Sequence, residues 1–115
     1  QKNHADADVE TAQTFIEKNY MNKIIVDDLC NLLGIGRRTF ERRFKKATAN
    51  TILEYIQRTR VEAAKKQLEL GVKTVNEIMF DVGYLDTKAF RTTFKKITGL
   101  SPVEYKNKYN KVLVS

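Results

Sequence analysis

The sequence predicts an all-α protein of about seven helices, in which two helix-turn-helix subdomains are joined by a long central helix. Three observations indicate this fold class. Apolar residues recur at helical spacing along most of the 115 residues. Residues that start or stop helices stand between these stretches. One pattern of residues occurs twice along the chain.

The first three helices are predicted over about residues 7–20, 26–33 and 37–47. The first has an apolar stripe made of Val9, Ala12, Phe15, Ile16 and Tyr20. The second is expected to end at Gly34 and to turn three leucines toward the core, Leu29, Leu32 and Leu33. The third has an inward stripe of Phe40, Phe44 and Ala47.

The remaining four helices are predicted from their capping residues. In a capping box, a Ser or Thr and a Glu three residues later each satisfy a free backbone N–H. Such boxes occur at Thr51–Glu54, Thr74–Glu77 and Ser101–Glu104. They open helices over about residues 51–70, 75–83 and 102–110. Asp86 caps a further helix that extends to about residue 97.

The repeat relates residues about 50 positions apart. At an offset of 49, Val26, Asp28, Leu29 and Gly34 correspond to Val75, Glu77, Ile78 and Gly83. At an offset of 50, Phe40, Phe44, Lys45, Lys46, Thr48, Glu54 and Tyr55 correspond to Phe90, Phe94, Lys95, Lys96, Thr98, Glu104 and Tyr105. Each copy is a short helix, a glycine-containing turn and a second helix, which is the outline of a helix-turn-helix.

This pattern divides the chain into five segments. We predict a terminal linker over residues 1–6, a first subdomain over 7–50, a connecting helix over 51–71, a second subdomain over 72–110 and a tail over 111–115. A helix of about 19 residues spans roughly 28 Å, and successive major grooves on one face of DNA lie about 34 Å apart. One chain could therefore place both copies in adjacent grooves.

The composition favours a polyanionic partner. Lys and Arg number 21 against 14 Asp and Glu, which gives a net charge of +7 and an isoelectric point near 9.6. Nucleic acid is the first candidate for this partner and an anionic membrane the second. No stretch approaches the roughly 18 uninterrupted apolar residues of a membrane span, and no signal peptide opens the sequence. We therefore expect a cytoplasmic protein.

The second helix of each copy has a mostly cationic stripe opposite its phenylalanines. The stripe consists of Arg38, Glu41, Arg42 and Lys45 in the first copy and of Lys88, Arg91, Thr92 and Lys95 in the second. A major groove about 12 Å wide admits one such helix. We predict base contacts by Arg38, Glu41, Arg42, Thr87, Lys88, Arg91 and Thr92. We predict phosphate contacts by Arg37, Arg43, Lys45, Lys46, Lys95 and Lys96.

Over about residues 7–110 the chain resembles the AraC/XylS family of transcription activators. The resemblance is carried by GIGRRTFERRFK at 34–45, GYLD at 83–86, FKK at 94–96 and GLSPVEY at 99–105. It implies a C-terminal DNA-binding domain whose partners are double-stranded DNA and RNA polymerase, with an effector-binding or dimerising domain elsewhere in the protein. Residues 4–6, 12–13 and 38–44 are similar to the branch whose N-terminal domain is glutamine-amidotransferase-like.

The first copy departs from the family pattern at two places. Gly36 stands where the family usually has a serine that caps the helix, so this helix is expected to start less firmly. Ala49 and Ile52 replace a glycine and a proline that the second copy retains. These replacements predict a different turn into the central helix.

The second copy departs from the family at one contact position. Thr92 stands where the family often has an arginine. We therefore expect Lys88 and Arg91 to carry more of the base reading in that copy.

Catalysis and metal binding are not predicted, and no cofactor is expected. His4 is the only histidine, and its spacing from Asp6 and Asp8 matches no strong metal motif. These aspartates are better explained as the start of a helix. Cys30, the single cysteine, cannot form an intrachain disulfide and suits a small core position.

Two other binding classes are alternatives. A protein-interaction or membrane-surface module with basic amphipathic helices predicts large apolar side chains exposed opposite the charges. An RNA-binding module favours an aromatic-rich sheet, of which the sequence shows no sign. Three tyrosines are expected to pack in the core rather than stack on bases, Tyr55, Tyr84 and Tyr105.

Overall fold

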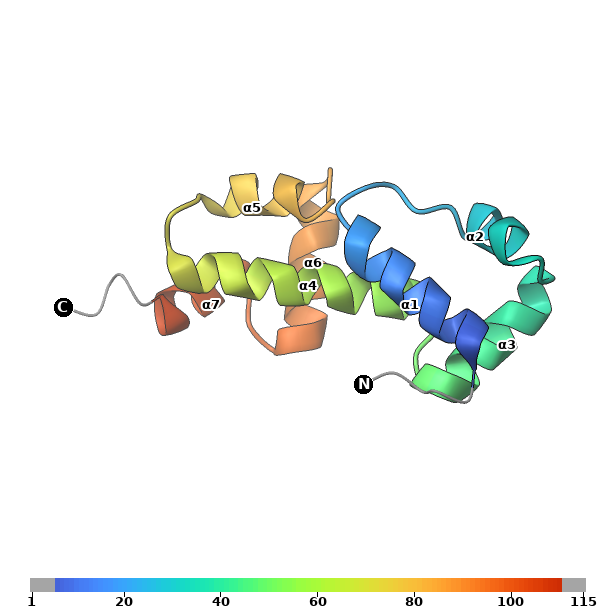
Figure 1. Ribbon diagram of the computed structural model, residues 1–115. Helices are drawn as coiled ribbons and strands as arrows, with labels where there is room; N and C mark the ends of the chain where they lie inside the picture. Colours follow the sequence, from blue (N-terminus) through green and yellow to red (C-terminus); the bar gives the residue numbers. More distant parts are fainter. Residues whose placement is uncertain (1–5, 111–115) are drawn as a thin grey trace. The chain divides into compact units, whose positions relative to one another are not determined.

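The computed structural model describes residues 6–110 and confirms the predicted all-α fold (Figure 1). The described residues form seven helices and no strand. The helices are α1 (Ala7–Asn19), α2 (Val26–Leu33), α3 (Arg37–Thr48), α4 (Ile52–Leu70), α5 (Val75–Asp81), α6 (Thr87–Thr98) and α7 (Pro102–Tyr109). The predicted ends agree to within about two residues. The predicted tail, 111–115, and linker residues 1–5 with His4 lie outside the described residues.

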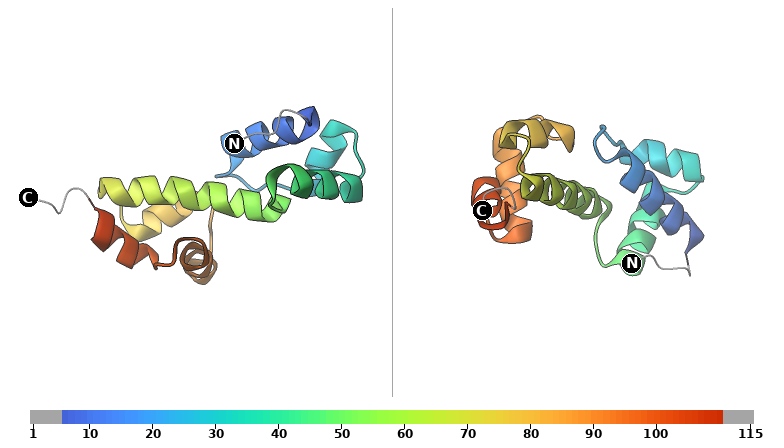
Figure 2. Two further views of the ribbon diagram at one scale, coloured as in Figure 1. Left: turned by 90° about the horizontal axis from the view of Figure 1, so that it is seen from below. Right: turned by 60° about the vertical axis from the view of Figure 1, so that its left-hand side comes forward.

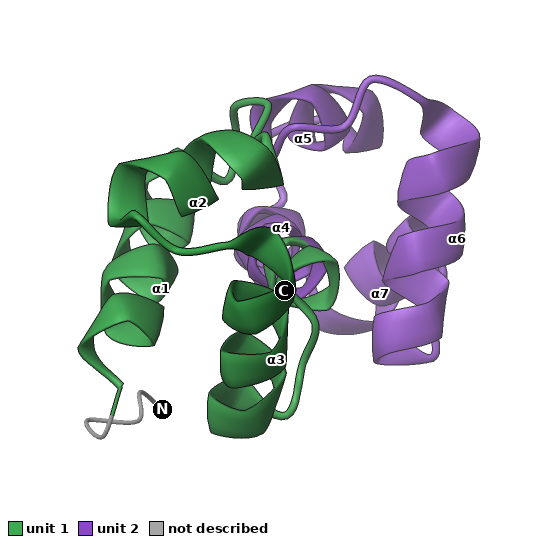
Figure 3. Cartoon of the chain, turned by 90° about the vertical axis from the view of Figure 1, so that its right-hand side faces the viewer, with its two compact units in different colours: residues 1–56 green, residues 57–115 purple. Residues whose placement is uncertain are grey.

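The chain divides into two compact units, Gln1–Ile56 (unit 1) and Gln57–Ser115 (unit 2) (Figure 3). The division falls inside α4, so that the start of this helix belongs to unit 1 and the remainder to unit 2. Each unit therefore has its own set of packed helices. The five-segment division made from the sequence stays a prediction.

In unit 1, α1 and α2 both pack against α3 (Figure 1). The core of this unit consists of Val9, Ala12, Ile16, Leu29, Cys30, Phe40, Phe44, Ile52 and Ile56. Burial of each large apolar side chain contributes about 1.5–3 kcal/mol to folding. The prediction of a core position for Cys30 is confirmed, and burial raises the pKa of its thiol.

The prediction that Leu32 faces the core is wrong, because 72% of this residue is exposed. The buried positions of α2 are Leu29 and Cys30, and Leu33 is half-buried. Successive residues of an α-helix are rotated by about 100°. The centre of the arc defined by these three residues therefore lies about 110° from Leu32. The buried face of α2 therefore contains Cys30 instead of the larger Leu32 that the leucine spacing predicts.

In unit 2, α6 contacts both α5 and α7. The right-hand view of Figure 2 shows these three helices beside the α4 segment of their own unit. The buried apolar side chains are those of Val61, Ala64, Leu68, Ile78, Met79, Val82, Tyr84, Phe90, Phe94, Pro102 and Tyr105. The Arg60 guanidinium lies 5.4 Å from the centroid of the Tyr84 ring, a cation–π contact that covers this tyrosine.

The two units contain the same run of three aromatic rings. The rings belong to Phe40, Phe44 and Tyr55 in unit 1 and to Phe90, Phe94 and Tyr105 in unit 2. Successive ring centroids are 5.9 and 5.4 Å apart in unit 1 and 5.8 and 5.5 Å apart in unit 2. All four phenylalanines are fully buried. The repeat that the sequence predicts is therefore confirmed in the packing of both cores.

The tyrosine at the end of each run is anchored through its hydroxyl. Tyr55 donates to Glu17 at 2.7 Å, and Tyr105 donates to Glu69 at 2.5 Å. Burial and the neighbouring carboxylate raise the pKa of Tyr55 to about 12, and the same causes raise the pKa of Tyr105. Tyr84 is also buried. The packing role predicted for these three tyrosines is confirmed.

The prediction that Ala49 and Ile52 change the turn into α4 is wrong. Both units end the preceding helix with a left-handed residue, Ala49 with φ of 64° and Gly99 with φ of 86°. In both, the hydroxyl of the preceding threonine accepts from the N–H two residues on, at 3.1 Å. This bond and the aromatic run impose the same turn on both units. Alanine adopts it at a cost of about 1–2 kcal/mol.

The predicted helix starts are confirmed. All three capping boxes form, and Asp86 accepts from the Ala89 N–H at 2.9 Å. Helix α3 begins at Arg37, and its N-cap residue Gly36 supplies no side-chain cap, as its residue type predicts. Among residues 6–110, no helix combines the length and the apolar composition that crossing a membrane requires.

Phe44→Ala is expected to lower the free energy of unfolding by about 3–5 kcal/mol, because removal of a fully buried ring leaves a cavity. Phe94→Ala should cost a similar amount in unit 2. Phe15→Ala is the matched control, since Phe15 is 36% exposed and should cost about 1 kcal/mol. Chemical denaturation followed by circular dichroism measures all three. Equal losses at Phe44 and Phe15 would contradict the packing.

Ala49→Gly is expected to raise the free energy of unfolding by about 1 kcal/mol, because glycine adopts a positive φ without strain. Gly99→Ala is the reverse experiment and should lower it by a similar amount. A Cβ at Gly99 meets no atom within 4 Å, so the backbone conformation alone sets this cost. Thermal unfolding of both variants tests the pair. The idea fails if both changes shift Tm in the same direction.

Candidate nucleic-acid interface

The exposed face of α3 has the composition predicted for it. Arg38, Glu41, Arg42 and Lys45 are all exposed, while the phenylalanines on the opposite side of the helix are fully buried. The packing of unit 1 therefore fixes which side of α3 meets solvent. Three of these four side chains are long cations, and long donors on one helix face can reach base edges in a major groove.

The exposed face of α6 brings together the residues predicted to read bases in the second copy. Thr87, Lys88, Arg91 and Thr92 line one open hollow on the surface of unit 2, together with Asp86. The Asp86 carboxylate is held at the start of α6 by its bond to the Ala89 N–H. Four hydrogen-bonding side chains of the helix thus share one exposed surface.

The two surfaces are equivalent along the chain. The degree of burial at each position from 41 to 50 matches that at the position 50 residues later, from 91 to 100. Helical hydrogen bonding ends at the same point in both segments. Each predicted contact position of α3 in this stretch therefore has a counterpart on α6 with the same exposure.

Most cations of the two surfaces are free. Among residues 6–110, no ion pair engages Arg38, Arg42, Lys46, Lys88, Arg91 or Lys96. All six are exposed. Free, solvated cations on a helix surface gain little from the folded protein itself. They are available to a polyanion, and their positive charge adds to its attraction.

Arg37 is engaged within unit 1. Its Nη1 donates to Asp27 of α2 at 3.0 Å, and its Nε donates to Glu41 one turn along α3 at 3.1 Å. The hydrogen bond to Glu41 and the bond to Asp27 raise the pKa of the guanidinium. The spacing of Arg37 and Glu41 indicates this pair in the sequence, but Asp27, ten residues away, could not be found in that way.

Arg43 forms more hydrogen bonds to carboxylates within unit 1 than Arg37 does. It forms two hydrogen bonds to Asp6, at 2.9 and 2.6 Å, and a third to Asp8 at 3.1 Å. Asp6 also caps α1 by accepting from the Val9 N–H, so the predicted capping role is confirmed. The hydrogen bond from Arg43 holds the pKa of the Asp6 carboxyl below its usual range. A phosphate contact by Arg43 stays a prediction, and it requires these bonds to be exchanged.

The lysines at the end of each helix lie beside a capping-box glutamate. The Lys45 ammonium is 3.8 Å from the Glu54 carboxylate in unit 1. In unit 2, the hydrogen bonds with Ser101 lower the pKa of Glu104, and the charge of Lys95 lowers it further. Both lysines remain exposed. These contacts are long or indirect, and they leave the ammonium groups open to other anions.

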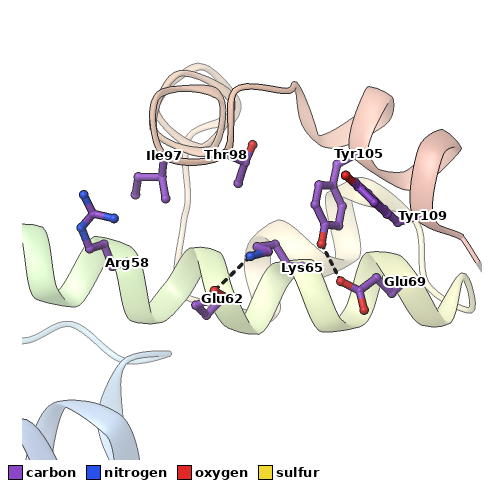
Figure 4. Close-up of a pocket in the computed structure, with 8 residues that line it drawn as sticks. All are labelled: Arg58, Glu62, Lys65, Glu69, Ile97, Thr98, Tyr105 and Tyr109. Atoms are coloured by element: carbon purple, nitrogen blue, oxygen red, sulfur yellow. Dashed lines mark hydrogen bonds and ion pairs between the residues drawn. The ribbon is translucent and has the colours of Figure 1, made fainter. Parts of the chain in front are cut away.

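Unit 2 also has a groove of about 600 Å³ between α4, α6 and α7 (Figure 4). Its lining residues are Arg58, Glu62, Lys65, Glu69, Ile97, Thr98, Tyr105 and Tyr109. The Lys65 ammonium is paired with Glu62 at 3.0 Å, and Glu69 accepts from the Tyr105 hydroxyl. The two carboxylates of the lining balance its two cations, so this groove offers a polyanion no excess of positive charge.

Among the residues that the structure describes, no group of three His, Cys, Asp or Glu side chains could hold a metal ion. Asp6 and Asp8 are bound to Arg43, and His4 lies outside the described range. Cys30 is buried. The exposed surfaces of α3 and α6 carry the residues predicted to contact DNA.

A family model described as a helix-turn-helix domain matches residues 29–108. The chain is 36% identical over 102 residues to an HTH-type transcriptional regulator in the cgkA 5′ region of Pseudoalteromonas carrageenovora, with 89% of the chain and 60% of that protein covered. It is 35% identical over 98 residues to the bifunctional transcriptional activator/DNA repair enzyme AdaA of Bacillus subtilis, with 85% and 46% covered.

It is also 34% identical over 102 residues to an AraC-like transcription regulator of Streptomyces lividans, with 89% of the chain and 34% of that protein covered. The chain therefore spans 34–60% of the length of these three relatives. Among solved structures, the DNA-binding domain of AdpA, in complex with a target DNA, is similar with a TM-score of 0.83 and 26% identity, with 90% of this chain and 94% of that chain covered. These relatives confirm the helix-turn-helix fold.

Asp6→Asn is expected to destabilise unit 1 while the cap of α1 remains, because asparagine caps helices but forms no ion pair with Arg43. Since Arg43 lowers the pKa of Asp6, the carboxylate contributes stability above its unfolded pKa of about 4. This contribution is lost as pH falls through the lower folded pKa. The difference in Tm between the natural protein and the variant should therefore be larger at about pH 7 than at about pH 3.

The matched control for this prediction is Asp28→Asn, since Asp28 is exposed in the first turn of α2. Asp28 has no ion pair within the described range. Thermal unfolding at both pH values measures the two variants side by side. A Tm difference for Asp6→Asn that does not depend on pH would show that its ion pair contributes nothing.

Proposed function

The chain belongs to the AraC/XylS family of helix-turn-helix domains, and we propose on this premise that it binds double-stranded DNA sequence-specifically as part of a transcription regulator. The observation that carries the proposal is the pair of equivalent exposed surfaces on α3 and α6, with six cations that have no ion pair among residues 6–110. A surface that is both cationic and helical fits the major groove in charge and in width.

The base contacts are divided between the two recognition helices, α3 and α6. On α3, Arg38 and Arg42 can each donate two hydrogen bonds to guanine O6 and N7, and Glu41 can accept from the amino group of cytosine. On α6, Lys88 and Arg91 supply the longest donors, while the shorter Thr87 and Thr92 add contacts at close range. Thr92 offers less reach than an arginine, so Lys88 and Arg91 carry more of the reading.

Phosphate contacts set the register of the helices on the duplex. Lys46 and Lys96 are the free cations at the end of each recognition helix. Lys45 and Lys95 join them, because their nearest carboxylates hold them only weakly. The contacts of Arg37 and Arg43 to aspartate and glutamate favour a role inside unit 1 for these two residues. Four lysines thus supply the main backbone contacts.

Two recognition helices in one chain favour a bipartite site in successive major grooves, about 10 base pairs apart. The whole protein would then need no second copy to occupy both grooves. We place it in the cytoplasm, with RNA polymerase as a partner and an effector-binding or dimerising domain outside the chain. The sequence favours the branch of the family in which that domain is N-terminal and glutamine-amidotransferase-like.

Selection of the chain against a randomised duplex library at near-physiological salt tests the proposal. We expect the bound pool to contain two short motifs about 10 base pairs apart. Recovery of a single motif would limit base reading to one unit. Tight binding at low salt without enrichment of any sequence would reduce the interaction to phosphate attraction and overturn the claim of specificity.

Substitutions assign each motif to its helix within the same experiment. Lys88→Ala and Arg91→Ala are expected to relax one motif, and Arg38→Ala and Arg42→Ala the other, each by about 1–3 kcal/mol of base discrimination. Lys66→Ala is the matched control, because Lys66 is an exposed cation of α4 outside both surfaces. If the Lys88 and Arg91 variants leave both motifs unchanged, α6 does not read bases.

A further inference from the structure

We propose that Arg37 is a positioning residue that holds the Glu41 carboxylate ready to read a base, rather than a contact to the DNA backbone. This inference rests on the proposed function. It also revises the role of Arg37, for which the sequence predicts a phosphate contact. The observation behind it is a chain of contacts from Asp27 through Arg37 to Glu41, which we call the Asp27–Arg37–Glu41 chain.

The Asp27–Arg37–Glu41 chain engages the Arg37 guanidinium at two of its nitrogens. Its guanidinium is held by Asp27, in the first turn of α2, at 3.0 Å. The same guanidinium donates through Nε to Oε2 of Glu41 at 3.1 Å. Glu41 is thereby linked to both helices of the helix-turn-helix. Its other oxygen, Oε1, takes no bond from Arg37 and is open to a donor from outside the protein.

A lone carboxylate is poorly suited to a surface that meets DNA, because the phosphates repel it. Arg37 reduces this repulsion, because it places a positive charge beside the Glu41 carboxylate. The Arg37 charge, which is shared between Glu41 and Asp27, therefore offsets part of the negative charge that Glu41 brings to the groove. Cytosine N4 and adenine N6 both offer an amino donor in the major groove, but adenine also presents its N7 acceptor, which repels a carboxylate. The base that this acceptor recognises is therefore cytosine.

The Asp27–Arg37–Glu41 chain contributes little to the stability of the free protein and more to that of the DNA complex. Side chains of Arg37, Asp27 and Glu41 are 51%, 64% and 50% exposed, and exposed ion pairs contribute about 0–1 kcal/mol. When DNA covers this surface and excludes water, the same charges interact in a medium of lower dielectric. Loss of Arg37 should therefore leave folding almost unchanged but disturb the bound state.

Unit 2 has no such chain. The positions that correspond to Asp27, Arg37 and Glu41 are Asn76, Thr87 and Arg91. These three residues line an open hollow of about 430 Å³ and form no ion pair within the described part of the chain. A carboxylate acceptor with its own counter-charge is thus a property of α3 alone, and the cytosine preference belongs to the motif read by unit 1.

The test compares Arg37→Gln, Glu41→Gln and Lys46→Gln by library selection and by the salt dependence of duplex affinity. The natural protein should enrich cytosine at one position of the unit 1 motif, and Glu41→Gln should abolish that enrichment. Arg37→Gln should reduce it about fivefold or more with an unchanged salt slope. Lys46→Gln is the matched control on the same helix, and should lower the slope by about 0.9 with all base preferences intact.

Three results overturn the inference. A fall of about 0.9 in the salt slope for Arg37→Gln would make Arg37 a phosphate contact. An unchanged cytosine preference in Arg37→Gln, or in Glu41→Gln, would remove the positioning role. If Arg37→Gln unfolds, which circular dichroism detects, Arg37→Lys replaces it, and the same criteria apply with an intermediate preference expected. Absence of any enrichment by the natural protein is a different result, because it overturns the proposed function itself.

Discussion

The packing of two phenylalanine rings against a tyrosine determines how each recognition helix is held. The Phe44 and Tyr55 rings meet nearly edge to face, with an interplanar angle of 85°, and Phe94 and Tyr105 meet at 82°. This arrangement is favourable for aromatic pairs and has few alternatives of equal energy. Because the inward side of α3 and α6 is fixed in this way, the outward side is fixed as well. Within each unit, the exposed cations of the helix share one face because these buried rings occupy the other.

Charges outside the cores are divided between folding and binding. Carboxylates at the start of α1 and α2 engage Arg43 and Arg37. Among residues 6–110, the remaining arginines and lysines of the two surfaces are free of ion pairs or weakly held. An arginine bound to two carboxylates contributes no net positive charge at its position. The net charge of +7 is therefore unevenly distributed. The paired arginines of α3 add little to the attraction of DNA, and the positive charge that attracts it is concentrated on the residues without ion pairs.

The helices and both cores could be predicted from the sequence, because capping boxes and phenylalanine spacing are local signals. Errors arose where the deciding contact is distant or the helix short. A helix of eight residues such as α2 offers few positions from which to define its buried face, so the leucine spacing wrongly predicted that Leu32 faces the core. The turn at Ala49 follows the aromatic run rather than the local preference of alanine. Asp6 and Arg43 lie 37 residues apart, and no pattern in one sequence connects them.

The two units share the aromatic run of their interiors and differ on their surfaces. Phe, Thr and Tyr recur 50 residues apart in the cores and turns, yet Glu41 corresponds to Arg91 and Arg43 to Thr93. Such a division follows from the physics of each position. An interior ring cannot change size without a cavity or a clash, whereas an exposed side chain can change charge at little cost to folding. One fold used twice can therefore present two different patterns of donors and acceptors, and the two halves of its DNA site should differ in sequence.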